Sequence, residues 1–154
     1  MFTLIQGDNH HTSEPEKRAV RAVIVQGSSI VLMHVSSSNT YVLPGGGVHE
    51  GETLEAALKR EVLEETGFEI NHYEYVTTID EYHDTMTRRH HIYRVTIGNT
   101  KNPISMTQEE HDLSMCMVRL PLEETIHRMA FSKGTHPYSE AIQLRDFIAL
   151  MHAL

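Results

Sequence analysis

The sequence lacks several features that would assign it to a broad class of protein. It has one cysteine, Cys116, which excludes an internal disulfide and favours a reducing, cytoplasmic location. No apolar run approaches about 20 residues and no signal peptide is recognisable, so neither membrane insertion nor secretion is expected. Basic residues number 13 against 21 acidic ones, which argues against a surface that coats nucleic acid. A nucleotide substrate remains compatible with this charge, because bound metal can neutralise phosphate groups.

The length of the chain fits a single domain. A chain of 154 residues can bury about two-thirds of its unfolded surface in one core. Neither an internal repeat nor a linker interrupts the sequence, so we expect one domain over residues 1–154.

The apolar patterns predict strands on both sides of one central helix. Strands are expected at residues 18–26, 30–35, 40–43, 68–80, 90–97 and 114–120, with an edge strand at 1–5. Helices are expected at residues 53–66, in a short segment that begins at Pro121, and at 139–153. The charged segment 81–89 and the polar segment 99–105 are expected to be loops. This order predicts an α/β fold, a mixed sheet with helices on both faces.

In the closing helix, apolar residues recur at helical spacing. We expect four of them to face the sheet: Ile142, Leu144, Ile148 and Met151.

The helix expected at residues 53–66 gathers carboxylates where the helix dipole opposes them. Glu61, Glu64 and Glu65 share a sector about 100° wide, and the small Ala57 leaves room above it. A solvated charged face is the usual interpretation of such a run. Here the repulsion would cost on the order of 1 to 2 kcal/mol. A divalent cation would reverse this cost, and carboxylate ligands suit Mg²⁺ or Mn²⁺.

Three consecutive glycines, Gly45, Gly46 and Gly47, precede this helix. Each glycine costs about 0.5 to 1 kcal/mol of backbone freedom relative to alanine. Their succession indicates unusual dihedral angles or a close approach of the backbone to a bound group. The alternative is a flexible turn, but a turn seldom needs three glycines.

These two segments together resemble the complete signature of the Nudix hydrolases. The fixed positions of that signature are all filled here: Gly46-x5-Glu52-x7-Arg60-Glu61-Val62-x-Glu64-Glu65-x-Gly67-Phe68. The similarity extends through residues 41–46 upstream and 120–124 downstream. Two positions depart from the family, which often has Trp in place of Tyr41 and Glu in place of His49.

The resemblance implies an α/β/α sandwich with a mixed β-sheet and a metal-dependent hydrolase. Its expected reaction is hydrolysis of a nucleoside diphosphate linked to another group, X, by attack of water on phosphorus. Metal ions, Mg²⁺ or Mn²⁺, would neutralise phosphate oxygens and orient the water. By similarity, Glu61 and Glu65 are expected metal ligands, Glu64 shares ligation or acts as the base, and the Gly45 carbonyl is a further ligand.

Four other motif residues are expected to have structural roles. Arg60 would brace a motif carboxylate through a forked hydrogen bond, and Glu52 would fix the loop against the helix. Gly67 offers the left-handed conformation that ends a helix. Gly46 belongs to the glycine turn.

Residues outside the motif offer weaker candidates. A carboxylate from the region of Glu109 and Glu110 often completes the metal site or acts as the base in this family. We favour Glu110, and the alternative is an exposed acidic turn. Tyr41 and Tyr82 are the aromatic candidates for stacking on a nucleotide base.

Basic and imidazole side chains carry less information. Arg21 is a candidate phosphate ligand with Arg18, Arg88 and Arg89, although surface charge is the default for all four. Twelve histidines suggest metal binding, with His83, His90 and His91 as the candidates. Because His90 and His91 are adjacent in an expected strand, they cannot chelate together. Ordinary surface or half-buried positions are expected for them.

Two alternatives to the enzyme remain open at this point. A Nudix-fold nucleotide-binding or regulatory module would have lost turnover, but such modules commonly lose motif glutamates and none is missing here. Processing of RNA caps or 5′ ends would want a basic groove, which the net charge of −8 disfavours. The sequence leaves the group X and a possible homodimer undetermined.

Overall fold

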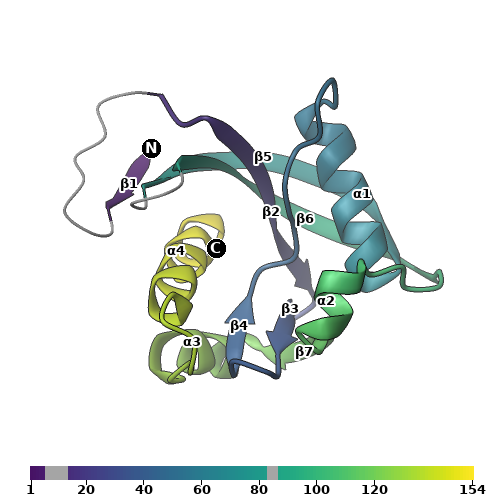
Figure 1. The fold of residues 1–154 in the computed structure, drawn as a ribbon. Helices are drawn as coiled ribbons and strands as arrows, with labels where there is room; N and C mark the ends of the chain where they lie inside the picture. Colours follow the sequence, from purple (N-terminus) through teal and green to yellow (C-terminus); the bar gives the residue numbers. More distant parts are fainter. Residues whose placement is uncertain (6–13, 83–86) are drawn as a thin grey trace.

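The computed structural model describes residues 1–5, 14–82 and 87–154 as one mixed sheet between helices (Figure 1). The elements follow in the order β1 Phe2–Ile5, β2 Lys17–Gln26, β3 Ser29–Val35, β4 Thr40–Val42, α1 Leu54–Thr66, β5 Phe68–Tyr82, β6 Thr87–Lys101, α2 Gln108–Asp112, β7 Met115–Pro121, α3 Leu122–Phe131 and α4 Ser139–Ala153. The predicted hairpin, central helix, edge strand and closing helix are confirmed.

The sheet has the strand order β1-β5-β6-β2-β3-β4, and β7 also pairs with β3. β2 runs parallel to β6, and β1 runs parallel to β5. The other pairs are antiparallel. The mixed sheet predicted from the sequence is therefore confirmed, and β2 lies near its centre.

Helices cover both faces of this sheet. One core lies beneath α1, where Leu58 and Val62 pack with Val20 and Ala22 of β2. The second core lies beneath α3 and α4, where Leu150 packs with residues such as Val23. Successive residues of a strand point to opposite faces, so the uninterrupted apolar run of β2 feeds both cores. The α/β/α arrangement follows from this pattern (Figure 1).

The ends of α1 are fixed by the residues that the sequence indicates. The Thr53 side chain accepts a hydrogen bond from the Ala56 amide at 3.1 Å and so caps the first turn. Gly67 adopts φ 75°, and its amide donates to the Leu63 carbonyl at 2.9 Å. These caps set where the helix begins and ends, and the packing of Leu58 and Val62 in the core fixes which side of it faces the sheet.

Residues 81–82 and 87–89 lie in strands and not in the loop that the sequence predicts over residues 81–89. β5 continues through Tyr82 and β6 begins at Thr87, while residues 83–86, including His83, lie outside the described residues. Opposite charges pair across the two strands, and Arg89 Nε lies 2.7 Å from Asp80 Oδ1. The charges of this segment are therefore paired between two strands and do not mark a loop. β6 also continues to Lys101, into the connection expected at 99–105.

The face that α4 buries also differs from the prediction. Leu144 and Met151 are exposed by 51% and 46%. Gln143 and Asp146 are buried in their place, and Asp146 accepts a hydrogen bond from the Leu43 amide at 2.8 Å. The apolar spacing was misleading because this helix turns polar groups toward the strands that it covers.

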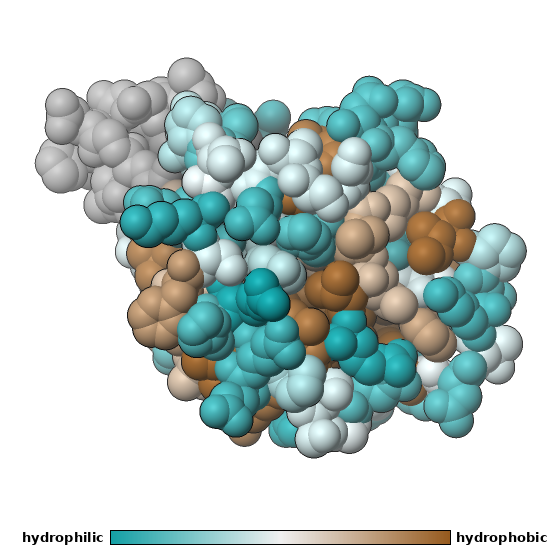
Figure 2. Space-filling view, turned by 90° about the horizontal axis from the view of Figure 1, so that it is seen from below, coloured by the Kyte–Doolittle hydropathy of each residue, from teal (hydrophilic) through white to brown (hydrophobic). Residues whose placement is uncertain are grey.

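Among the residues that the structure describes, the surface has no large continuous apolar area on the face seen in Figure 2, where small hydrophobic patches are separated by hydrophilic residues. In the described part of the chain, no helix has both the length and the apolar character that a membrane crossing requires.

Candidate metal and substrate site

The glycine turn lies against the central strand β2. The Val20 amide donates to the Gly46 carbonyl at 3.0 Å, and the Ala22 amide donates to the Pro44 carbonyl at 2.8 Å. Gly45 has φ 138°, and a Cβ atom there would collide with the Val20 carbonyl oxygen. At this position the turn needs glycine, because backbone approaches backbone.

Gly46 brings the turn equally close to α1. A Cβ atom on Gly46 would lie 2.5 Å from Glu61 Oε1. Gly47 has open space around it, since a Cβ atom there would meet nothing within 4 Å. The turn therefore packs against the carboxylate of Glu61 through one glycine and not through the next.

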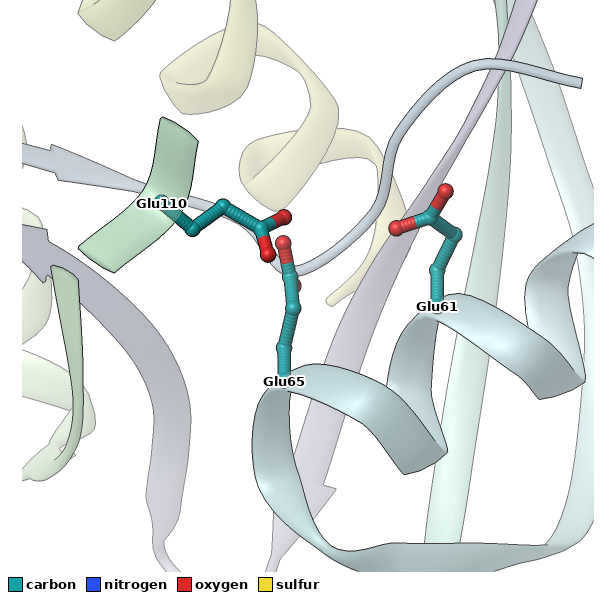
Figure 3. A group of neighbouring side chains, drawn as sticks. All are labelled: Glu61, Glu65 and Glu110. Atoms are coloured by element: carbon teal, nitrogen blue, oxygen red, sulfur yellow. The ribbon is translucent and has the colours of Figure 1, made fainter. Parts of the chain in front are cut away.

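Three carboxylates converge beside this turn. Glu61 and Glu65 extend from α1, and Glu110 reaches them from α2 (Figure 3). One oxygen from each lies within 4.8 Å of the others. Three anionic oxygens at such distances repel one another unless protons or a cation intervene. The donor set fits a hard divalent cation, which takes carboxylate oxygens and keeps several waters.

Burial makes the repulsion within this cluster stronger. Burial raises the pKa of Glu65 to about 8, although the Gly45 amide, which donates to its Oε2 at 2.9 Å, opposes the shift. Burial also raises the pKa of Glu61, and a hydrogen bond from Arg60 opposes that shift. Both residues would ionise more readily with a divalent cation among them.

Arg60 connects the turn, the helix and one carboxylate of the cluster. Its Nε and Nη2 donate to the two oxygens of Glu52 at 2.8 and 3.0 Å, which is the forked geometry of an arginine–carboxylate pair. Its Nη1 donates to Glu61 at 2.7 Å, and its Nη2 also donates to the Gly47 carbonyl at 3.0 Å. Hydrogen bonds from Arg60, together with one from the His49 amide, lower the pKa of Glu52 to about 2. These contacts are the ones that the expected bracing roles of Arg60 and Glu52 require.

Glu64 lies apart from the three clustered carboxylates. Its side chain is 35% exposed, and its Oε2 accepts from Arg60 Nη1 at 3.3 Å. The structure brings together Glu61, Glu65 and Glu110, and leaves Glu64 at the edge. The expected role of Glu64 in ligation or as the base stays a prediction.

The cluster opens into a cavity of about 630 Å³. The charged residues that line this cavity are five glutamates and three arginines: Glu61, Glu65, Glu81, Glu109, Glu110, Arg21, Arg88 and Arg145. The cavity is large enough for a nucleotide, since ligand pockets commonly measure about 300 to 1,000 Å³.

Of the three candidate substrate-binding residues outside the motif, one lines the cavity and two do not. Arg21 lines the cavity and donates to the Gly45 carbonyl, the group expected as a further metal ligand. Tyr41 is 9% exposed, stacks on His34 at a centroid distance of 4.4 Å and packs in the core under α3 and α4. Tyr82 is buried as well, and neither tyrosine lines the cavity. Their geometry does not support the expected stacking on a base.

His90 is wholly buried, which corrects the expectation of a surface or half-buried histidine. Its Nε2 lies 2.8 Å from Glu81 Oε2, and Glu81 also accepts from Arg145 at 3.3 Å. His91 is half-buried, as expected. Among the described residues, neither histidine joins a cluster of potential metal ligands.

Comparison with known families identifies the fold and the chemistry. The family model described as "NUDIX domain" matches residues 15–141, which is most of the chain. The chain belongs to the Nudix family. It is thus a Nudix pyrophosphohydrolase, and enzymes of this family generally need a divalent metal.

Solved structures of two Nudix hydrolases and of one further hydrolase share this architecture at low sequence identity. A MutT NUDIX hydrolase from Burkholderia pseudomallei aligns with a TM-score of 0.62 and 18% identity, covering 90% of this chain and 98% of its own. A NUDIX hydrolase from Nitrosomonas europaea aligns with a TM-score of 0.63 and 19% identity, covering 88% and 90%. A protein described as an ADP compounds hydrolase aligns with a TM-score of 0.60 and 16% identity, covering 90% of this chain and 76% of its own. At these identities the likeness establishes the Nudix fold.

Sequence reasoning did not single out three residues that line the cavity. Arg88 was one of four equivalent arginines, and no spacing distinguished it. Glu81 was assigned to a loop, and Arg145 lies in a helix whose apolar spacing indicated only packing. One signal could have placed Glu81 and Arg88 in strands. The alternation of apolar and polar residues in β5 and β6 would have to be extended through residues 81 and 88.

Proposed function

We propose that this chain hydrolyses the pyrophosphate linkage of a nucleoside diphosphate joined to another moiety, by attack of water on phosphorus. The observation that supports this most directly is the convergence of Glu61, Glu65 and Glu110 within 4.8 Å in a nucleotide-sized cavity. Water attack needs little covalent work from the protein, so positioning and charge neutralisation can provide most of the catalysis.

In this proposal the three carboxylates hold Mg²⁺ or Mn²⁺. A divalent cation there would neutralise phosphate oxygens and lower the pKa of a nucleophilic water. Arg60 keeps the Glu61 carboxylate in position, and the Gly45 amide does the same for Glu65. Glu110 lies on a different element from the other two, so it can complete the ion's ligands or accept a proton from the water.

The substitution Glu61→Gln tests this proposal. It removes one anionic ligand and keeps the side-chain volume, so the fold should persist while turnover falls on the order of 100-fold or more. Phosphate or monophosphate release should be measured with Mg²⁺ or Mn²⁺ on nucleotide sugars, dinucleotides and triphosphates. Glu69→Gln is the matched control. Glu69 is exposed on β5, so this substitution removes the same charge at a position away from the cavity.

Two outcomes would contradict the proposal. Wild-type turnover in folded Glu61→Gln would remove this residue from metal binding. Tight nucleotide binding by the wild type, without turnover of any substrate in the panel, would instead favour a nucleotide-binding or regulatory module.

A further inference from the structure

A group of arginines shares the cavity with the carboxylate cluster. Arg21 comes from β2, Arg88 from β6 and Arg145 from α4, and all three line the same space as Glu61 and Glu65. The side chains come from three elements that are distant in sequence, so the fold itself brings their positive charges together.

The three arginines differ in how their charge is balanced. Arg145 is paired, with Nε 2.7 Å from Asp146 and Nη1 3.3 Å from Glu81. Arg21 donates to the Gly45 carbonyl, a neutral acceptor, and its Nε is buried without a hydrogen-bond partner. The Arg88 side chain makes no hydrogen bond or ion pair with a residue that the structure describes, and its Nε is buried as well.

Buried donors without partners are costly, and here they are also crowded by like charge. Burial lowers the pKa of Arg21 to about 10, Arg145 also lowers it, and Asp146 and Glu65 oppose the shift. Burial likewise lowers the pKa of Arg88, with Arg145 as the second cause. An anion between Arg21 and Arg88 would offset this repulsion and accept hydrogen bonds from their guanidinium groups.

The carboxylate cluster does not supply that anion. Glu65 contributes to the field at Arg21, but its Oε2 accepts from the Gly45 amide and its cluster fits a cation. With a divalent ion among the carboxylates, their negative charge is largely neutralised and the arginines keep an excess of positive charge. The cavity then has a cationic side made of guanidinium groups beside the carboxylate cluster.

We propose that Arg88 and Arg21 bind a second anionic group of the substrate, beyond the phosphate oxygens that contact the metal. The substrate class is therefore a nucleotide that carries an additional acidic group, either a further phosphate of the chain or an acid on the group X. This inference rests on the proposed function, because it names the substrate class for that same site. Arg88 is the specificity-determining residue, since it has no other partner among the described residues.

Matched substrate pairs test this inference. UDP-glucuronate and UDP-glucose differ by one carboxylate on the sugar, and ATP and ADP differ by one terminal phosphate. Wild-type protein with Mg²⁺ should have a kcat/KM about 10-fold or more higher for the acidic member of at least one pair. Which pair responds distinguishes an acid on X from a further phosphate.

Arg88→Gln should remove this preference. Its kcat/KM should fall about 10- to 100-fold for the preferred acidic substrate and less than about threefold for the other member of that pair. Arg88→Lys, which keeps the charge and loses the fork, should retain part of the preference. Arg94→Gln is the control, because Arg94 is exposed on the same strand and should leave both substrates unaffected.

Measurements of turnover and of binding together distinguish a failure of the second-anion inference from a failure of the proposed function. If the wild type hydrolyses both members of both pairs equally, or Arg88→Gln slows both members equally, the second-anion inference is overturned. If nothing is hydrolysed, calorimetry with the same four nucleotides still decides it. Tighter binding of an acidic member that is lost in Arg88→Gln would support the inference while the proposed function fails.

Discussion

Glu109 and Glu110 are adjacent in sequence, but they hold different positions at the cavity. Glu110 points to Glu65 and belongs to the carboxylate cluster (Figure 3), whereas the Glu109 side chain is exposed. Glu110 also closes a capping box, in which its Oε2 accepts from the Thr107 amide at 2.6 Å. The cap fixes the carboxylate on a short helix that would otherwise be poorly ordered.

We predict that Glu110→Gln slows hydrolysis more than Glu109→Gln does. Glutamine can still accept the hydrogen bond of the capping box, so the helix should persist while the anionic oxygen is lost. A decrease of about 10-fold or more is expected for Glu110→Gln, and less than about threefold for Glu109→Gln. Steady-state kcat with Mg²⁺ measures both. Equal and unaltered rates would remove this region from the mechanism.

At the scale of single residues, the chain's own pattern indicated the part of the site that lies on one helix, and the family resemblance indicated Glu110. Glu61 and Glu65 could be placed together because both lie on one helix, where their spacing determines their direction. Arg145 could not be placed from the sequence, because its position in the cavity depends on how α4 is rotated against the sheet. That rotation is set by hydrogen bonds such as the one from the Leu43 amide to Asp146.

At the scale of elements, the glycine turn and α1 form one unit. The turn is held on one side by hydrogen bonds to β2 and on the other by Arg60, which donates to the Gly47 carbonyl. Gly46 permits contact with the Glu61 carboxylate, and Gly47 has free space. Glycines that are adjacent in the turn should therefore respond differently to the same substitution.

We predict that Gly46→Ala weakens metal binding and activity, while Gly47→Ala leaves them nearly unchanged. The new Cβ atom at residue 46 would displace the Glu61 carboxylate, which is the movable end of a side chain, so stability should change little. Metal affinity should fall about 10- to 100-fold, as for other changes that misplace a ligand. Calorimetric titration with Mn²⁺ and thermal melting of both variants measure this. Equal affinities would show that the contact does not position Glu61.

The sequence predicted elements well where their ends have local signals. Thr53 and Gly67 marked both ends of α1, and the caps are as expected. α2 was missed, because five residues are too few for an apolar period to appear. The extension of β5 and β6 was missed because the pairing of Asp80 with Arg89 is visible only once the two strands are aligned.

At the scale of the whole molecule, the sheet order determines which charges meet in the cavity. β2 runs parallel to β6, so Arg21 and Arg88 enter the same space from neighbouring strands. Neither this pairing nor its register follows from the composition of either strand, because parallel partners are chosen by long-range packing. The family resemblance implied the α/β/α architecture, whereas the cationic side of the cavity emerged only from the assembled fold.

The buried carboxylate of Glu65 should make the stability of the whole protein depend on pH and metal. Its pKa is raised from 4.5 to about 8 by burial. Without metal, Glu65 therefore contributes stability that is fully present below pH 4.5 and is lost as the pH rises through about 8. Ionising the group in the fold costs on the order of a few kcal/mol. A bound divalent cation offsets this cost, because it favours the charged form.

We predict that Glu65→Gln gains stability relative to the wild type between pH 5 and pH 9 when metal is chelated. Glutamine does not ionise, so the variant avoids the cost that the wild type acquires with rising pH. Excess Mg²⁺ should restore the wild type at pH 9 and have little effect on the variant. Urea unfolding at both pH values, with EDTA or Mg²⁺ and with Glu69→Gln as the reference, measures these differences. The difference in unfolding free energy between variant and wild type could instead be the same at pH 5 and pH 9. Glu65 would then ionise in the fold without this cost, and the cluster would not need a cation to offset it.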